Sequence, residues 1–169
     1  RGVKPNRYTA AELFRKAALK GDIRAEVAWG KVLAQGSGVK RNYKEAAVWF
    51  RKAADQGVAI AQYNLGYLYA HGRGVPHDEK SAITWYTKAA DQGLADAQFS
   101  LGWLYLNSKG EIQSDTQAVH WLEKAAEQEH AKAQNNLAYM YLEGRGFALS
   151  PEKALYWYTR AAEQGYATA

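Results

Sequence analysis

The sequence contains no cysteine, only three prolines, and no apolar run of the roughly 20 residues that a membrane-spanning helix requires. The absence of cysteine excludes disulfide bonds, thiolate nucleophiles and cysteine-ligated zinc or iron–sulfur sites. It does not determine the compartment, because a well-packed helical protein needs no disulfide even in an oxidising space. The first residues, Arg1-Gly2-Val3-Lys4-Pro5, contain neither an initiator methionine nor the apolar core of a signal peptide. We therefore expect a trimmed or mature N-terminus.

Motifs that carry chemistry are also scarce. The sequence has no Gly-x-Ser-x-Gly nucleophile elbow, and no two of its four histidines have the i, i+4 spacing of a helical metal pair. Gly-x-Gly turns at Gly36, Gly72 and Gly144 resemble phosphate-binding loops, but such loops follow a strand, whereas these glycines follow predicted helices. We expect no catalytic residue, no cofactor and no bound metal.

The charge is distributed unevenly along the chain. The net charge is +5, but residues 1–57 contain 13 Lys and Arg against 5 Asp and Glu, a balance of +8. Residues 58–169 contain 9 against 12, a balance of −3. Such a basic first third can steer a partner electrostatically, or it can be an ordinary solvated surface; both interpretations stay open.

The dominant feature of the sequence is an internal repeat of 36 residues. Trp49, Trp85, Trp121 and Trp157 are each 36 residues apart, inside copies of the motif Ala-x-x-Trp-x-x-x-Ala-Ala. A second motif, Leu-Gly or a close variant, stands 20 residues before each tryptophan. A degenerate earlier copy of the first motif has Leu13 in the tryptophan position. Self-similarity at a fixed period is the signature of a repeat architecture.

Both motifs have helical spacing, and capping residues separate them. In one copy Ala61, Leu65 and Tyr69 recur at intervals of four, which places them on one face of a helix. The positions before the second helices suit N-caps, which are Asn42, Asp78, Ser114 and Ser150. The sequence predicts helices at 8–20, 24–35, 43–56, 60–71, 79–92, 96–107, 115–128, 132–143 and 151–164.

A single helical hairpin cannot bury its apolar face, but stacked hairpins can. The small residues Gly66 and Gly102 allow helices to approach closely, and the tryptophans fill the space between repeats. We predict an all-α fold, a right-handed α/α superhelix (solenoid) of four tandem 36-residue helix-turn-helix repeats plus a preceding helix. The expected single domain, 1–169, consists of a leading helix at 8–20 and repeats at 22–57, 58–93, 94–129 and 130–165.

These motifs resemble the Sel1-like repeat family, which is related to the tetratricopeptide repeat. The resemblance covers about residues 22–165 and rests on Ala61, Leu65-Gly66, Tyr69, Gly72-Arg73-Gly74-Val75, Asp78, Lys80, Ala82, Trp85-Tyr86, Lys88-Ala89-Ala90 and Gly93. It implies an α/α superhelix that acts as a scaffold or adaptor in protein assemblies, mostly in bacteria. The roles it suggests include polysaccharide export and regulation, host interaction, and immunity to secreted toxins.

Four residues depart from the family pattern. Ser108 and Glu129 replace glycines, Glu111 replaces a valine, and Ala138 replaces the glycine of the Leu-Gly motif. A left-handed conformation at Glu129 costs about 1 kcal/mol relative to glycine. We therefore predict that residues 108–130 are locally irregular or form the least stable junction of the array.

In related helical repeats, the non-consensus positions of the first helix line a concave groove. Carried over by spacing, these positions are Arg24, Val27, Lys31, Ile60, Tyr63, Tyr67, His71, Asp96, Phe99, Trp103, Asn107, Lys132, Asn135, Tyr139 and Glu143. Exposed aromatic residues in a concavity resemble interface hot spots. The alternative is that these side chains only pack against the next repeat.

We expect a non-catalytic scaffold or adaptor that binds another protein in this groove, including as a bacterial immunity or regulatory protein for a secreted effector. Two alternatives stay open. A cell-wall or β-lactam-related enzyme rests on family analogy alone. Nucleic acid could bind the basic stretch of Lys40, Arg41, Lys44, Arg51 and Lys52, although that stretch lacks interleaved exposed aromatics. A bacterial periplasmic or secreted location is favoured over the cytoplasm.

The C-terminal end raises a question of assembly. Ala169 occupies the same repeat position as Ala97 and Ala133, and the last predicted helix contains Tyr156 and Trp157 without an evident cover. Because solenoids need polar caps for solubility, we expect either that the array continues or that two uncapped ends pair in a homodimer.

Overall fold

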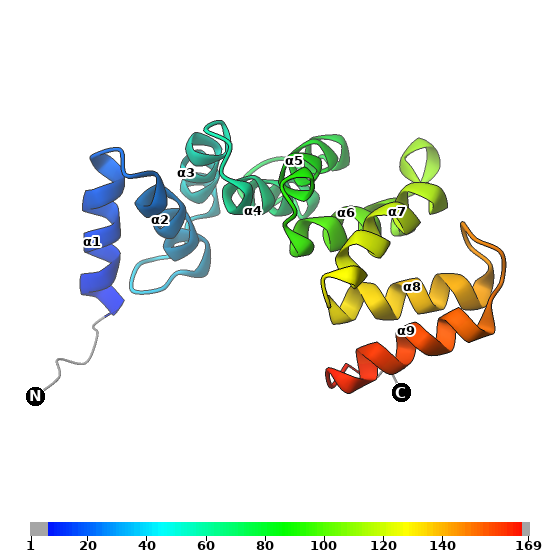
Figure 1. The fold of residues 1–169 in the computed structure, drawn as a ribbon. Coiled ribbons are helices and arrows are strands. Elements are labelled where there is room, and N and C mark those ends of the chain that lie inside the picture. Colours follow the sequence, from blue (N-terminus) through cyan, green and yellow to red (C-terminus); the bar gives the residue numbers. More distant parts are fainter. Residues whose placement is uncertain (1–6, 167–169) are drawn as a thin grey trace, which may run out of the picture. The chain divides into compact units, whose positions relative to one another are not determined.

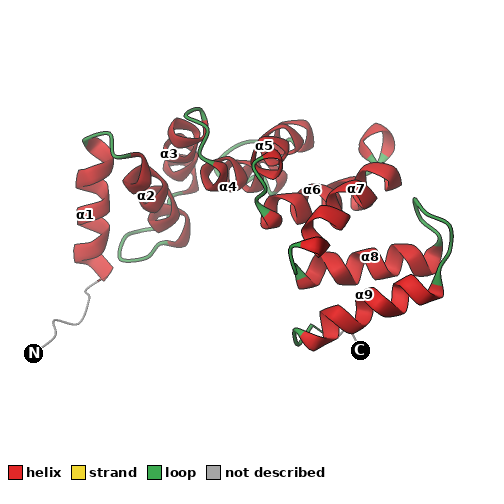
Figure 2. Ribbon diagram, in the orientation of Figure 1, coloured by secondary structure: helices red, strands yellow, loops and turns green. Residues whose placement is uncertain are grey.

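The computed structural model describes residues 7–166, and every regular element in this range is helical (Figures 1 and 2). The helices are α1 (Arg7–Leu19), α2 (Ile23–Gln35), α3 (Tyr43–Ala54), α4 (Ala59–Ala70), α5 (Glu79–Asp91), α6 (Ala95–Asn107), α7 (Asp115–Glu127), α8 (Ala131–Glu143) and α9 (Pro151–Glu163). A short 3-10 helix, Gly110–Ile112, lies between α6 and α7. The prediction of nine α-helices is confirmed over the described residues, with bounds that differ by at most two residues.

The chain forms two compact units, residues 1–89 (unit 1) and residues 90–169 (unit 2). In unit 1, α2 packs against both α1 and α3, and α3 packs against α4. In unit 2, α7 packs against both α6 and α8, and α8 packs against α9. Helices that are neighbours in sequence are thus neighbours in space within each unit, as expected for stacked hairpins. The single domain expected from the sequence stays a prediction.

The repeated tryptophans and small residues form the core in the expected way. Trp85 and Trp121 are buried, whereas Trp49 and Trp157 are half-buried. A Cβ atom on Gly66 would lie 2.8 Å from the Tyr86 ring, and one on Gly102 would lie 2.8 Å from Cγ of Leu122. These glycines therefore permit the close approach of the two helices of a hairpin, as predicted.

The four predicted N-caps are also confirmed. The side chains of Asn42 and Asp78 accept hydrogen bonds from the backbone N–H groups three residues later, each at 3.1 Å. Ser114 and Ser150 do the same at 3.3 and 3.4 Å. Each cap satisfies one of the N–H groups that a helix leaves without an internal partner, and so determines where the second helix of the repeat begins.

The junction at residues 108–130 is irregular, as predicted. Glu129 has φ 61°, and it occupies the position taken by glycines with φ between 78° and 87° at Gly21, Gly57, Gly93 and Gly165. Ser108 has an extended conformation in place of the left-handed one found at Gly36 and Gly144, and the 3-10 helix follows it. The low stability expected of this junction stays a prediction.

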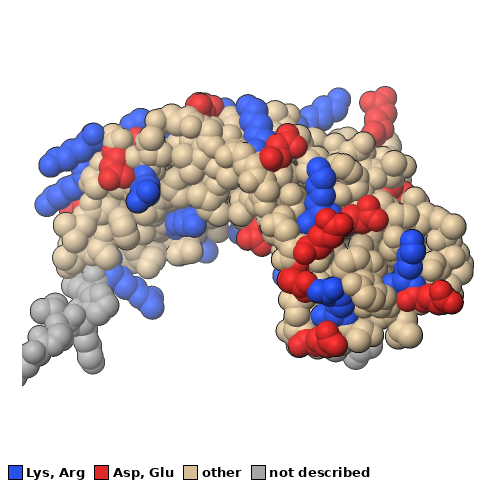
Figure 3. Space-filling model, viewed as in Figure 1, with Lys and Arg blue, Asp and Glu red and all other residues tan. Residues whose placement is uncertain are grey.

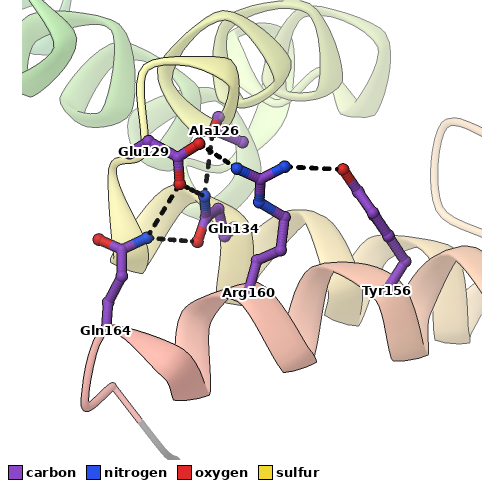
Figure 4. A network of polar contacts seen from close by, with 6 residues as sticks. All are labelled: Ala126, Glu129, Gln134, Tyr156, Arg160 and Gln164. Carbon is purple, nitrogen blue, oxygen red and sulfur yellow. Dashed lines mark hydrogen bonds and ion pairs between the residues drawn. The ribbon is translucent and has the colours of Figure 1, made fainter.

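The Glu129 carboxylate lies in a polar network within unit 2 (Figure 4). It forms an ion pair with Arg160, and it accepts a hydrogen bond of 3.2 Å from Gln134 and one of 3.5 Å from Gln164. Arg160 also donates to the hydroxyl of Tyr156 at 2.8 Å. The strained residue thus links the end of α7 with α8 and α9.

Two expectations concern the ends of the chain. The first is a trimmed or mature N-terminus, and the second is that the array either continues beyond its C-terminal end or pairs there in a homodimer. Both stay predictions, because residues 1–5 and Ala169 lie outside the described residues. On α9, Leu155 and Tyr156 are exposed, and Trp157 is half-buried.

Candidate partner-binding surfaces

In unit 1, most of the predicted groove residues are engaged with their own neighbours. Ile60 and Tyr67 are half-buried against the core, and the ring of Tyr63 lies 5.7 Å from the ring of Tyr86. The centre of the His71 ring lies 4.1 Å from that of the Tyr67 ring with an interplanar angle of 30°, and its Nδ1 atom lies 2.9 Å from the Tyr67 carbonyl oxygen. For these aromatic rings, packing within the repeat array explains part of their placement.

The charged positions of unit 1 are more accessible. Arg24 is exposed on α2 and Lys31 is half-buried on the same helix. Val27, which the spacing also placed in the groove, is buried, so it is not available to a partner. The physical reason is its place in the repeat: Val27 corresponds to Tyr63, Phe99 and Asn135, which are all half-buried, so this position faces neighbouring helices.

In unit 2, two of the aromatic side chains predicted to line the groove are about half exposed to solvent. Trp103 on α6 is 49% exposed and Tyr139 on α8 is 43% exposed. They occupy the same position in successive repeats, 36 residues apart. Neighbouring positions such as Leu101 and Met140 are buried completely, so the core is filled without the exposed rings.

Most of the remaining predicted positions of unit 2, on α6 and α8, have polar side chains. Asp96, Asn107, Lys132 and Glu143 are exposed, and Asn135 is half-buried. The Asn107 amide donates to the Trp103 carbonyl oxygen at 2.9 Å, which is a bond within α6.

Phe99 differs from Trp103, because it packs inside unit 2. Its ring stacks on the His130 ring at 4.6 Å with an interplanar angle of 20°. His130 is the N-cap of α8, where Nδ1 accepts from the Ala133 N–H at 3.2 Å. Its Nε2 atom lies 3.4 Å from an Asp96 carboxylate oxygen. Burial lowers the pKa of His130, although Asp96 opposes this effect. The neutral ring is the form that can accept the capping bond.

The role of His130 was missed from the sequence, but a signal was available. Position 130 corresponds to Asp22, which caps α2 by accepting from the Ala25 N–H at 2.9 Å. The same position is filled by Val58 and Leu94 in the middle repeats, and neither makes a side-chain cap. The repeat alignment alone could therefore have assigned His130 to helix capping.

A pocket in unit 1 was also missed. It has a volume of about 360 Å³ and is lined by Lys31, Ala34, Gln35, Arg41, Tyr43, Phe50, Asn64, Tyr67, Leu68 and Arg73. Among these, only Lys31 and Tyr67 were predicted groove residues, and Arg41 belonged to the basic stretch considered for nucleic acid. The pocket draws its cations from α2, from the turn before α3, and from the Gly72-Arg73-Gly74 turn after α4.

The basic stretch proposed for nucleic acid is partly used inside the fold. Arg51 donates to the Tyr69 hydroxyl, and its guanidinium carbon lies 5.7 Å from the centre of the Trp85 ring. Lys52 forms an ion pair of 2.6 Å with the buried Glu26. On the face drawn in Figure 3, Lys and Arg predominate over the early helices of unit 1, and both signs of charge mix over unit 2. The cations of residues 1–57 therefore do not form one continuous basic surface on which every charge is available to a partner.

Two searches of the described residues concern other kinds of site. Between residues 7 and 166, no three His, Asp or Glu side chains gather in an arrangement that could hold a metal ion. In the same range, no helix has both the length and the apolar character of a membrane span.

Comparisons with known proteins identify the repeat. The Sel1 repeat model matches residues 1–22, 23–58, 59–94, 95–130 and 131–166. A Sel1 repeat protein from Oxalobacter formigenes superposes with a TM-score of 0.89 at 34% identity, and the match covers 98% of this chain and 66% of that one. The protein c5321, a protective antigen of uropathogenic Escherichia coli with an SLR fold, gives a TM-score of 0.87 at 37% identity over 92% of this chain.

The match to c5321 covers 33% of its length, so the chain spans only part of each of these two proteins. The immunity protein Pa5087 of Pseudomonas aeruginosa, at 16% identity and a TM-score of 0.53, shares the fold alone. A comparison with curated protein sequences finds no match. The predicted fold class, a helical solenoid of tandem repeats, is confirmed. The chain belongs to the Sel1 repeat family, whose repeats generally mediate protein–protein interaction.

Proposed function

We propose that this chain is a non-catalytic scaffold that binds a partner protein through the first helices of its repeats. The observation that carries the proposal is the exposure of Trp103 and Tyr139 at the same position of successive repeats. Tryptophan and tyrosine are enriched among the residues that dominate interface energies. Two such residues at one repeat position form the kind of surface that a partner helix or extended segment can follow.

The free energy available from burying the Trp103 side chain supports this role. A large aromatic side chain buries on the order of 150–250 Å² when it is fully covered. Since about half of the Trp103 surface is exposed, a partner that covers it removes on the order of 100 Å² from water. At about 25 cal/mol per Å², this burial contributes roughly 2 to 3 kcal/mol to binding, which is the range of a hot spot.

The proposal assigns no catalytic residue. His130, whose pKa is lowered by burial, is accounted for by helix capping. The enzyme alternative rests on family analogy, and no observation on residues 7–166 favours it. A bacterial periplasmic or secreted immunity or regulatory role is a narrower form of the proposal, and its support is the family resemblance.

The test is to compare partner capture by the wild-type chain with capture by Trp103→Ala and Tyr139→Ala. Proteins retained from the source organism would be identified by mass spectrometry, and the partner would then be purified for titration calorimetry. Each substitution is expected to weaken the binding of that partner by at least about 2 kcal/mol, or roughly 30-fold in affinity. Leu155→Ala removes a still more exposed apolar side chain from the second helix of a repeat, α9, and serves as the control.

If both aromatic substitutions leave the affinity of the purified partner unchanged, the assignment of this surface is wrong. A loss that Leu155→Ala reproduces would also contradict it, because the effect would then not be specific to the first helices.

A further inference from the structure

The pocket of unit 1 is lined by three cations and no carboxylate. Lys31, Arg41 and Arg73 contribute to its wall, while its other lining residues are aromatic, aliphatic or amide side chains. Within the described part of the chain, none of these three cations forms an ion pair. A partly enclosed group of like charges is unfavourable by itself, so it favours binding of an anion.

The repeats themselves show what Arg73 lacks. Arg145 occupies the same position in the last turn of the array, two repeats later, and it holds Asp115 through two bonds: Nε to Oδ2 at 3.1 Å and Nη2 to Oδ1 at 2.5 Å. The residue opposite Arg73, at the position of Asp115, is Tyr43. Its hydroxyl accepts a long hydrogen bond of 3.4 Å from Arg73. The bidentate carboxylate present in unit 2 is thus replaced by a phenol in unit 1.

Aromatic rings hold the two arginines without neutralising them. The guanidinium carbon of Arg73 lies 5.5 Å from the centre of the Tyr43 ring and 5.2 Å from that of Tyr67. The guanidinium carbon of Arg41 also lies 5.5 Å from the Tyr43 ring. Cation–π contacts of this kind restrict a long side chain, so less conformational entropy is lost when a ligand binds.

We propose that this pocket binds a carboxylate of an acidic segment in the partner protein. Arg73 would form the two-pronged contact that Arg145 makes with Asp115, and Arg41 and Lys31 would add charge. The proposal rests on the proposed function, since the carboxylate is supplied by a bound protein. It adds the chemistry that the partner must present.

A nucleic acid fits this site less well than an acidic peptide does. A nucleic-acid backbone presents a row of phosphates and is bound along a continuous basic track. Two cations that such a track would need, Arg51 and Lys52, have partners inside unit 1. What is left is a bounded pocket of about 360 Å³, which is at the small end of the range for ligand sites.

The test uses two pools of fluorescein-labelled octapeptides and fluorescence anisotropy. The pools are identical except that two central positions are Asp or Glu in one and Asn or Gln in the other. The wild-type chain is expected to bind the acidic pool at least about 10-fold more tightly, because bonds to charged groups contribute roughly 1.5–3 kcal/mol. Raising the salt concentration should reduce this preference.

Variants connect the preference to the pocket. Arg73→Gln should abolish the preference, and Arg41→Gln, at an exposed position before α3, should reduce it. Lys80→Gln removes the same charge from an exposed position of α5 in unit 1, and it should leave the preference unchanged. Circular dichroism melting of each variant separates a lost site from a lost fold, and Arg41→Gln remains informative if Arg73→Gln is unstable.

Three results would overturn the inference: equal binding of the two pools, an equal loss in Lys80→Gln, or binding of inorganic phosphate or oligothymidine in place of the acidic pool. The proposed function is tested separately, because Trp103 and Tyr139 belong to unit 2 and are read out by partner affinity. Loss of that affinity in Trp103→Ala together with no acidic preference would contradict the pocket alone. If the wild-type chain prefers the acidic pool but Trp103→Ala keeps its affinity for the partner, only the first-helix surface is contradicted.

Discussion

Glu129 allows the effect of an unfavourable backbone conformation on the stability of this array to be measured. Its φ of 61° is one that a non-glycine residue adopts at a cost of about 1 kcal/mol relative to glycine. Its carboxylate offsets part of that cost through Arg160 and Gln134, but the ion pair is exposed to solvent and is therefore weak. The two effects oppose each other.

Two substitutions separate the two effects. Glu129→Ala loses the carboxylate and keeps the strain, so we expect a lower unfolding free energy than that of the wild type. Glu129→Gly loses the same carboxylate but relieves the strain, so we expect it to be more stable than Glu129→Ala by about 1 kcal/mol. Both variants remove the same contacts, so this difference reports the left-handed conformation, less the greater conformational entropy of glycine in the unfolded chain.

The assay is urea unfolding followed by circular dichroism and by tryptophan fluorescence. Gly93 is a matched control, because it has φ 85° in the same unit and a Cβ there would meet no atom within 4 Å. Gly93→Ala should lose about 1 kcal/mol for the same reason. If the Ala and Gly variants of Glu129 are equally stable while Gly93→Ala is destabilised, the strain at Glu129 is not what limits this junction.

Three further predictions concern unit 2. Gly102→Ala should cost about 1 to 3 kcal/mol by urea unfolding, because the new Cβ meets Leu122 at 2.8 Å inside a filled core; a neutral result would show that the hairpin can widen. Burial lowers the pKa of His130 below the unfolded value near about 6.5, so the capping contribution is full above that pH and is lost as the pH falls through the folded pKa. Thermal melts at pH 7.5 and 5 should show a larger drop for the wild type than for His130→Asn, and equal drops would contradict it. Hydrogen exchange should be faster over 108–114 than in the other turns, and full protection there would refute an unstable junction.

The helix boundaries were predictable because the signals that set them are local. Asn42 and Ser114 cap helices through bonds to the third residue beyond them, which is a relation visible in the sequence itself. The partners of Gly66 and Gly102 come from the second helix of the same repeat, so the close approach of the helices was predictable from the 36-residue period, although the partner side chains were not assigned. Local and short-range rules therefore account for the fold.

The candidate surfaces were less predictable, because exposure depends on neighbours that spacing does not specify. Trp103 and Phe99 stand four residues apart on one helix, yet Trp103 is exposed while Phe99 is half-buried against His130. Whether Arg73 is paired depends on residue 43, which lies 30 positions away in sequence. The signal was present in the repeat alignment, where Tyr43 stands at the position of Asp115, but it becomes meaningful only once the contact is known.

The charged residues of unit 1 show how differences between repeats determine what a partner can reach. In later repeats, Gln98 and Gln134 donate from buried positions to backbone carbonyl oxygens at 3.1 Å. Glu26 takes this position in the first repeat, fully buried, and its carboxylate is met by Lys52. An ionised glutamate cannot donate, so it must be paired with a cation. Lys52 is therefore retained by the fold, whereas Arg73, opposite a tyrosine, is left available to an outside carboxylate.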